Sequence, residues 1–365
     1  MEKGSDEMII GMREEARDRV RDQRIERVVE LVSPEALLAD LPLGAERERV
    51  VVSGRKDVEN VLERADDRLL VVVGPCSVHD PEAALEYAGR LAGLAGELGD
   101  DLLVAMRVYF EKPRTTTGWK GLINDPHLDD SGDVNAGLRT ARRLLLEVLE
   151  IGLPIGCEYL DPITPQYIAD TVAWGAIGAR TTESQTHRQL ASGLSMPIGF
   201  KNRTDGNVGV AVDALRAAGS RHSFAGVELG GGSAILRTAG NADCHIILRG
   251  GRGTTNYDAE SVADTIERLR AVGLPERVII DASHDNSGKD HEREPAVAAD
   301  IAAQIAAGNG AIVGVMLESF LEAGRQEPDG ALTYGMSVTD ACMAWDTTVD
   351  VLRGLDAAAR TRRGG

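Results

Sequence analysis

Basic side chains stand close behind short apolar runs at several places in this 365-residue chain. The basic residues in question are Arg107, Lys112, Arg114, Arg180, Lys201 and Arg249. Arginine guanidinium groups bind phosphate and carboxylate through two parallel hydrogen bonds, and lysine ammonium groups add a point charge. Six converging cations exceed the need of one phosphate. They suit about three anionic groups, such as two phosphates and a carboxylate.

A second set of residues combines one thiol, one imidazole and two carboxyl groups. Its members are Cys76, His284, Glu318 and Asp340, and they come from four separate segments. Taken singly, Cys76 could be a small buried apolar side chain, and His284 a hydrogen-bonded core histidine. Together they form a mixed soft and hard ligand set for a divalent metal, and their separation is typical of a catalytic metal site. A metal beside several anion sites indicates that a carbonyl group is polarised while phosphorylated substrates are held in place.

The loop EKPRTTTGWKG, residues 111–121, concentrates positive charge in a chain whose formal net charge is -18. Taken alone, it is either a solvated loop or a loop that closes on a phosphate. The chain contains no phosphate-binding GxxxxGK[ST] loop, no GxGxxG after a strand and no GxSxG nucleophile motif. These absences argue against ATP, NAD and serine-hydrolase chemistry.

Eight apolar runs separated by helical patterns must position these residues. The runs are LLVVVGPCS (69–77), LLVAMRVYF (102–110), LPIGCEYL (153–160), WGAIGARTT (174–182), MPIGFKN (196–202), CHIILRGG (244–251), RVIIDASH (277–284) and AIVGVMLES (311–319). Continuous apolar strands that alternate with helices are typical of a parallel sheet covered on both faces. Eight such units predict an α/β fold of the (β/α)8 TIM-barrel type, in which functional residues gather at the carboxyl ends of the strands. An open doubly wound sheet is the alternative.

Two segments do not follow this alternation of strands and helices. Residues 1–65 are charged and prone to form helices, so we expect an N-terminal extension with a regulatory or oligomerisation role, followed by the barrel in residues 66–365. Ser33 and Pro34 predict the start of a helix, and residues 49–62 suggest a strand, a glycine turn and a helix. Residues 223–238 predict a β-hairpin inserted between barrel strands five and six. The final residues suggest a frayed end.

Composition narrows the class of protein. The acidic balance argues against nucleic acid or an anionic membrane as a partner. The four cysteines are far apart, with no CxxC pair, and do not form a disulfide framework. No stretch reaches about 18 apolar residues. We therefore expect a soluble cytoplasmic protein with reduced thiols.

The motifs together resemble one enzyme family. They are GPCSVHD, MRVYFEKPRTTTGWKGLINDPH, GARTTESQTHRQLASG, GFKNRTDG, CHIILRGG, DASHDNSGK, GVMLES and SVTDA. This combination, from about residue 21 to residue 353, resembles the class I 3-deoxy-D-arabino-heptulosonate 7-phosphate (DAHP) synthases, the transferases that open the shikimate pathway to chorismate and the aromatic amino acids. The resemblance implies a homo-oligomeric (β/α)8 enzyme that condenses phosphoenolpyruvate with erythrose 4-phosphate, using Mn2+, Co2+, Fe2+ or Zn2+.

The resemblance also implies roles for individual residues. The metal ligands would be Cys76, His284, Glu318 and Asp340. The phosphoenolpyruvate site would be Arg107, Lys112, Arg180, Lys201 and Arg249. The erythrose 4-phosphate site would be Lys112, Pro113, Arg114, Thr115 and Thr116. The catalytic residues would be Lys112, Glu158, Lys201 and His284.

The implied reaction is an attack by C3 of the enol on the aldehyde carbon. Water then adds at C2, with Glu158 or Lys201 handling a proton, and phosphate leaves by C–O cleavage.

The regulatory parts depart from the family pattern. Many members have DDxRI near the N-terminus where this chain has RDQRI, so Arg21 replaces an acid. Many carry Thr-Lys in the hairpin where this chain has Glu228-Leu229, and a methionine is common at the position of Pro162. We therefore expect a feedback pocket that binds a different aromatic amino acid, or none.

Two other functions fit part of the pattern. One is a related enzyme that condenses phosphoenolpyruvate with another sugar phosphate, such as arabinose 5-phosphate, although the KPRTT segment favours erythrose 4-phosphate. The other is a catalytically inactive regulatory subunit. The presence of every expected metal and anion position argues against the second alternative.

Overall fold

The structure, a computed structural model, describes residues 22–114, 116–328 and 330–364. The chain divides into two compact units, Met1–Leu31 and Val32–Gly365. In the first unit, described residues 22–31 form a turn and then irregular backbone, without helix or strand. Arg21 and Thr115 lie outside the described residues, and the predictions that concern them stay predictions.

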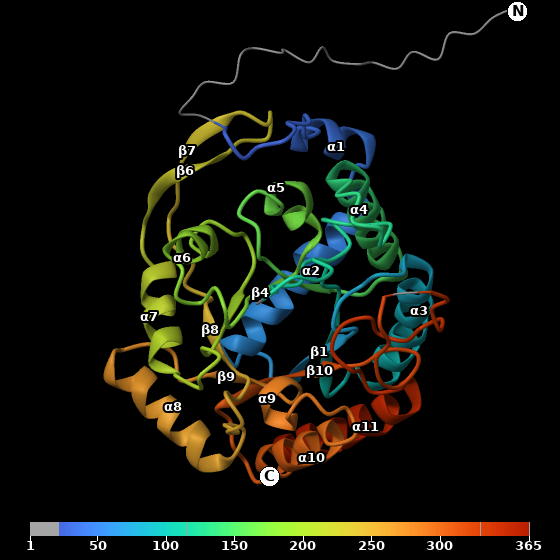
Figure 1. Cartoon of the computed structure of the whole chain (residues 1–365). Helices are drawn as coiled ribbons and strands as arrows, with labels where there is room; N and C mark the ends of the chain where they lie inside the picture. The colour runs from blue at the N-terminus through green and yellow to red at the C-terminus, as the bar shows by residue number, and fades with distance from the viewer. Residues whose placement is uncertain (1–21, 115, 329, 365) are drawn as a thin grey trace, which may run out of the picture. The chain divides into compact units, whose positions relative to one another are not determined.

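The second unit is built on a closed barrel of eight parallel strands in the order β1-β10-β9-β8-β5-β4-β3-β2 (Figure 1). The barrel strands are β1 (Leu69–Gly74), β2 (Leu102–Arg107), β3 (Ile155–Glu158), β4 (Trp174–Ile177), β5 (Ile198–Lys201), β8 (His245–Leu248), β9 (Val278–Asp281) and β10 (Ile312–Glu318). Each falls within one of the eight apolar runs. The (β/α)8 prediction is confirmed, and the open-sheet alternative is wrong.

Helices surround the barrel and connect its strands. They are α1 (Pro34–Asp40), α2 (Ala45–Leu62), α3 (Pro81–Leu98), α4 (Val134–Ile151), α5 (Pro165–Ile168), the 3-10 turn η1 (Ala169–Thr171), α6 (Gln185–Ala191), α7 (Gly209–Ala218), α8 (Ala259–Ala271), α9 (His284–Ser287), α10 (Glu294–Ala306) and α11 (Trp345–Gly364). Ser33 accepts a hydrogen bond from the Ala36 N–H and Pro34 is the first helical residue of α1, as the sequence predicts. The last segment is not frayed, because α11 continues to Gly364.

Every residue of the eight barrel strands is buried, which explains why the strands are continuous apolar runs. Five of the strands nevertheless end on a charged residue. These residues are Arg107, Glu158, Lys201, Asp281 and Glu318. Because parallel strands share one carboxyl end, the fold brings these five charges to the same end of the barrel.

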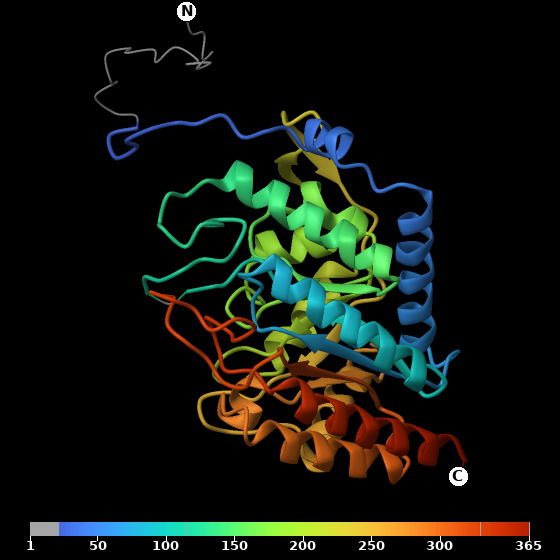
Figure 2. The ribbon, with the colours of Figure 1, turned by 90° about the vertical axis from the view of Figure 1, so that its right-hand side faces the viewer.

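Helix α2 closes the other end of the barrel. Its Val58 and Leu62 side chains belong to the same buried cluster as Leu70 and Trp174 from the barrel strands. Figure 2 shows α2 at the end opposite to the long connections that follow β2 and β10. The strand predicted within residues 49–62 is wrong. The β-branched run there is part of a helix whose buried face repeats every three to four residues, from Val51 to Leu62.

The predicted hairpin is confirmed as the antiparallel pair β6 (Ser223–Val227) and β7 (Ser233–Arg237). Its tip contacts the start of α1, because the Glu35 N–H donates a hydrogen bond to the Leu229 carbonyl over 2.8 Å. Phe224 and Leu236 are half-buried cross-strand partners, whereas Ile235 is 76% exposed. The hairpin thus leaves part of its apolar surface uncovered in this chain.

No helix in the described part of the chain is long and apolar enough to cross a membrane. All four cysteines are buried free thiols.

Candidate active site

A cavity of about 150 Å³ lies at the carboxyl ends of the barrel strands. It is lined by Cys76, Arg107, Tyr109, Glu111, Lys112, Pro113, Glu158, Gly178, Ala179, Arg180, Lys201, Thr204, Arg249, His284, Asp285, Lys289 and Asp340. Most of the residues expected from the sequence to bind anions or metal are therefore found around one space.

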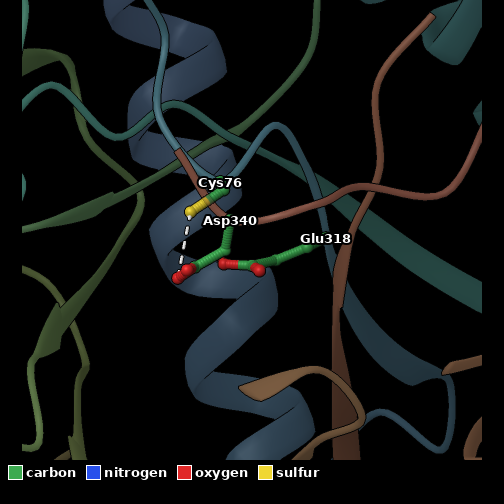
Figure 3. A group of neighbouring side chains, drawn as sticks. All are labelled: Cys76, Glu318 and Asp340. Carbon is green, nitrogen blue, oxygen red and sulfur yellow. Dashed lines mark hydrogen bonds between the residues drawn. The ribbon is translucent and has the colours of Figure 1, made fainter. Parts of the chain in front are cut away.

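Three of the four expected metal ligands form a compact group. One ligand atom each from Cys76, Glu318 and Asp340 lies within 4.8 Å of the other two (Figure 3). Cys76 follows β1, Glu318 ends β10, and Asp340 precedes α11. A thiol and two carboxyl groups at this spacing fit a divalent ion that accepts both sulfur and oxygen ligands.

His284, the fourth expected ligand, lies beside this group rather than within it. Its Nε2 atom is 3.7 Å from Glu318 Oε1, and its Nδ1 atom is 2.9 Å from Asp281 Oδ2. The residue adopts a left-handed backbone conformation, with φ of 53°, which is strained for a non-glycine residue and is often found at functional sites. Burial lowers the pKa of His284. The neutral ring this favours is the form that binds metals, and the Asp281 contact leaves Nε2 facing the group.

Lys112 bridges two members of the metal-ligand group. Its Nζ atom lies 2.9 Å from Cys76 Sγ and 2.8 Å from Asp340 Oδ2. Burial disfavours the charged form of Lys112, but its electrostatic interactions with Cys76 and Asp340 raise its pKa. Burial also works against ionisation of Asp340, but the Lys112 charge and its hydrogen bond outweigh it and lower the pKa of this carboxyl. Burial raises the pKa of the Cys76 thiol.

The other buried cations each have a carboxylate partner. Arg107 Nη2 donates to Glu318 Oε1 over 2.8 Å, and its guanidinium carbon stacks 3.7 Å from the Tyr109 ring centroid. Lys201 Nζ lies 3.6 Å from Glu158 Oε2 and 3.4 Å from Asp281 Oδ2.

Arg249 Nη1 pairs with Asp285 Oδ2. In this state of the protein, charge around the cavity is largely compensated within the site.

The basic loop contributes less to the cavity than the sequence suggests. Lys112 and Pro113 line it, whereas Arg114 and Thr116 are exposed and are not among the lining residues. Arg114 instead lies against Gly118, whose added Cβ would be 2.6 Å from a guanidinium nitrogen. Arg180 lines the cavity and is exposed. The expected anion-binding set is thus divided into buried residues and a more exposed margin.

Sequence reasoning missed several lining residues, including Tyr109, Glu111, Asp285 and Lys289. Two of them carried a usable signal, because Arg107, Tyr109 and Glu111 alternate and so face the same side of an extended chain. The other two follow His284 in the short helix α9 and the turn after it. No periodic pattern marks that segment.

Gly178 makes room for Glu158. A Cβ atom at position 178 would lie 2.8 Å from Glu158 Oε1. This glycine therefore allows the backbone just after β4 to pass close to the carboxylate that faces the cavity.

Comparisons with known proteins agree on one family. The DAHP synthetase I family matches residues 45–353. The phospho-2-dehydro-3-deoxyheptonate aldolase of Corynebacterium glutamicum is 55% identical over 351 residues, covering 94% of this chain and 95% of that protein. The Phe-sensitive enzyme of Escherichia coli K12 is 56% identical over 345 residues, covering 94% and 98%, and a Tyr-sensitive enzyme of the same strain is 53% identical over 326 residues, covering 88% and 91%.

A solved structure extends this agreement to three dimensions. The phospho-2-dehydro-3-deoxyheptonate aldolase of Francisella tularensis superposes with a TM-score of 0.92 at 50% identity, covering 93% of this chain and all of the other. Both the barrel and its connections are therefore shared with this relative.

Glu111 gives a prediction that concerns stability rather than turnover. Its side chain is 4% exposed and accepts a hydrogen bond from Thr164 Oγ1 over 3.0 Å. Burial, followed by the charge of Asp161, raises the pKa of Glu111 from 4.5 to about 7. Between these two values the folded protein keeps a proton that the unfolded chain releases, so the contribution of Glu111 to stability declines as the pH rises from about 4.5 to 7.

We expect the Glu111→Gln variant, which cannot ionise, to gain stability relative to the unsubstituted protein over the same pH interval. The full gain is roughly 3 kcal/mol. Urea unfolding of both proteins at several pH values would measure it. A stability difference that does not change with pH would mean that Glu111 is already ionised in the folded protein at the lower pH.

Proposed function

The chain belongs to the DAHP synthetase I family and is a DAHP synthase, and we propose that the cavity at the carboxyl ends of its barrel strands is the place where phosphoenolpyruvate and erythrose 4-phosphate are joined. The observation that carries the proposal is the compact Cys76, Glu318 and Asp340 group, of which Cys76 and Asp340 line the same cavity as the buried cations. Metal ligands beside anion-binding groups are what a condensation of two phosphorylated substrates requires.

The metal proposal assigns a divalent ion, such as Mn2+, Co2+, Fe2+ or Zn2+, to Cys76, His284, Glu318 and Asp340. A bound ion would supply Lewis-acid polarisation of the aldehyde oxygen. The donor set supports this assignment because it joins a thiol, carboxyl groups and an imidazole whose Nδ1 is held by Asp281. Lys112 occupies the space between Cys76 and Asp340 with its own positive charge. We infer that Lys112 leaves these two groups when a cation takes them and is then available to a substrate oxygen.

Phosphoenolpyruvate is assigned to Arg107, Lys112, Arg180, Lys201 and Arg249. The three residues Arg107, Lys201 and Arg249 are 2%, 3% and 5% exposed, so a bound anion would be largely removed from water. In such a setting a charge-assisted hydrogen bond is stronger than at the surface. The positions of these cations also restrict how the enol can face the second substrate.

Glu158 and Lys201 are proposed to exchange the proton that accompanies water addition at C2. Lys201 Nζ stands between the Glu158 and Asp281 carboxylates, at 3.6 and 3.4 Å. A lysine placed between two carboxylates can donate to one developing negative charge and recover a proton through the other. His284 would take part as a metal ligand held by Asp281.

Erythrose 4-phosphate is assigned to Lys112, Pro113, Arg114, Thr115 and Thr116. The base of this loop is closed by a 2.8 Å hydrogen bond from the Lys112 N–H to the Lys120 carbonyl. Because Arg114 and Thr116 are exposed and do not line the cavity, we infer that the loop turns inward when the aldehyde phosphate binds. The exposed cation and hydroxyl groups would then gain a phosphate partner.

The Cys76→Ala variant tests the metal proposal. We expect it to fold, to lose the metal and to show no more turnover than chelator-treated protein, because the thiolate is the soft ligand of the set. Addition of Co2+ to the unsubstituted protein should give a thiolate-to-metal charge-transfer band, and Mn2+ or Co2+ should restore the activity that a chelator removes. The band should be absent in the variant.

Cys244→Ala is the matched control, because Cys244 is also a buried free thiol but does not line the cavity. It should keep both the band and turnover. Full activity of Cys76→Ala with one metal per chain would show that the ligand assignment is wrong.

Substitutions of three arginines test the division of the anion sites. Arg180→Ala and Arg249→Ala should weaken phosphoenolpyruvate binding more than erythrose 4-phosphate binding, and Arg114→Ala should do the reverse. A charge-assisted contact is worth roughly 1.5–3 kcal/mol, so losses of about tenfold or more in affinity are expected. Steady-state KM values for both substrates measure this. Equal effects of all three substitutions on both substrates would rule out separate sites.

Control by an aromatic amino acid is proposed from the names of two relatives, one Phe-sensitive and one Tyr-sensitive. The proposed site is the half-buried side of the hairpin, where Phe224 and Leu236 face each other, together with residues 32–65 of the N-terminal extension. The same surfaces are proposed to assemble the chain into a dimer or tetramer. Pro162 would alter which amino acid is preferred.

Titration with phenylalanine, tyrosine and tryptophan tests this proposal. We expect one of them to lower turnover and to raise the melting temperature, with a stabilisation of about 2.7 kcal/mol at a hundredfold excess over Kd. Phe224→Ala should lose the response while keeping turnover. If none of the three acts at millimolar concentration, and removal of the hairpin dissociates the oligomer, the hairpin serves assembly alone.

A further inference from the structure

The ion pair between Arg249 and Asp285 has no place in the function proposed above. Arg249 follows β8 and Asp285 lies in α9, and both line the cavity. An arginine assigned to a substrate anion is here paired with a carboxylate of the protein itself. The contact therefore raises the question of what Asp285 does when the substrate arrives.

The nitrogen atoms of the Arg249 guanidinium differ in their hydrogen bonding. Nη1 donates to Asp285 Oδ2 and, over 3.3 Å, to the Gly250 carbonyl. Nε is buried and has no hydrogen-bond partner among the described residues. An unpaired buried N–H is costly unless a ligand takes it. The protein thus fixes one edge of the group and leaves donor capacity for an incoming anion.

Asp285 is held in place from its own side. Asn286, the next residue, donates from Nδ2 to the Leu248 and Asp281 carbonyls over 3.2 and 2.8 Å. Gly250 has a φ of 72°, and a Cβ there would lie 2.9 Å from Asp285 Cβ. This close approach fixes the Asp285 backbone next to Arg249. The Asp285 side chain therefore starts from a backbone position that keeps it within reach of Arg249.

The exposure of the ion pair allows an anion in the cavity to approach Arg249 beside Asp285. The Arg249 side chain is 6% exposed and that of Asp285 is 23%. A nearly buried guanidinium without a counter-charge would be strongly unfavourable, which explains the need for a resident carboxylate. The more accessible partner is the carboxylate, so its negative charge also faces any anion that approaches.

We propose that Asp285 is a resident counter-ion of Arg249, which orients this arginine and lowers its affinity for the anionic group of phosphoenolpyruvate. The inference rests on the proposed function, in which Arg249 binds phosphoenolpyruvate. Asp285 is in this sense a positioning residue whose charge sets how tightly substrate and released phosphate are held. Weaker binding of phosphate at Arg249 favours release of inorganic phosphate after the reaction.

The test is an Asp285→Asn substitution in the full-length protein with Mn2+. Asparagine keeps an oxygen that accepts from Arg249 Nη1 but removes the negative charge. One unit charge at about 4 Å in water is worth close to fivefold in affinity, and more in a partly buried site. We expect Kd for phosphoenolpyruvate by calorimetry, its KM, and the inhibition constant of inorganic phosphate to fall by about five- to tenfold.

Asp205→Asn is the matched control. Asp205 also pairs with an arginine, Arg203, near the same end of the barrel, but it does not line the cavity. It should leave the affinity for phosphoenolpyruvate within about twofold of the unsubstituted protein. Melting temperatures of all variants would establish that they fold, and Asp285→Ser offers a second charge-removing variant if the asparagine is unstable.

The outcomes separate the two proposals. If Arg249→Ala weakens phosphoenolpyruvate binding and Asp285→Asn strengthens it, the counter-ion inference is supported. If Arg249→Ala weakens binding but neither Asp285 variant strengthens it, the inference is wrong and the proposed function stands. An equal gain from Asp205→Asn would also overturn the inference, because the effect would then be one of net charge. If Arg249→Ala leaves binding unchanged, the assignment of Arg249 to the substrate fails first.

Discussion

Compensation of buried charge at the carboxyl ends of the strands is the constraint on which the rest of the structure depends. Arg107 and Glu318 are each 2% exposed, and they meet over 2.8 Å between β2 and β10. Arg107 also donates to the Pro75 and Cys76 carbonyls, each over 3.1 Å. One guanidinium therefore ties together the ends of three neighbouring strands. Loss of either partner of such a buried pair typically costs about 3–5 kcal/mol.

The same constraint gives the site its character. The buried cations of the cavity, Arg107, Lys201 and Arg249, each have a protein carboxylate nearby. Under the proposed function, binding of substrates would exchange one partner of a paired cation for another, rather than place an anion on an uncompensated positive charge. Such an exchange requires little reorganisation, because α2 and the barrel interior hold the strands from the opposite end.

The sequence predicted both strands and site residues where an apolar run ends on a charged residue. Apolar runs that end on Arg107, Glu158 or Lys201 could be predicted as strands and as site residues at once, because a charge after a buried run needs a partner. The sequence was less informative where tertiary packing determines the secondary structure. The valines of α2 look like a strand by propensity, and only their burial against the barrel reveals the helical period.

Pairings across the fold could not be predicted at all. Lys112 and Asp340 are 228 positions apart in the sequence. No pattern in either segment predicts that the two side chains form an ion pair. The position of Arg114 outside the cavity lining could not be predicted either, since a basic loop has the same composition whether it is open or closed. The resemblance to a known family supplied the roles of these residues, and the structure supplied the contacts.

The central claim is that a metal and phosphoenolpyruvate meet in this one cavity. Anomalous diffraction at the manganese edge, from crystals grown with Mn2+ and phosphoenolpyruvate, tests it most directly. The account predicts a single strong peak bonded to Cys76 Sγ and to the side chains of His284, Glu318 and Asp340, with the phosphate of phosphoenolpyruvate on Arg180 and Arg249. A manganese peak at any other place, or one without the Cys76 thiolate as a ligand, would contradict it.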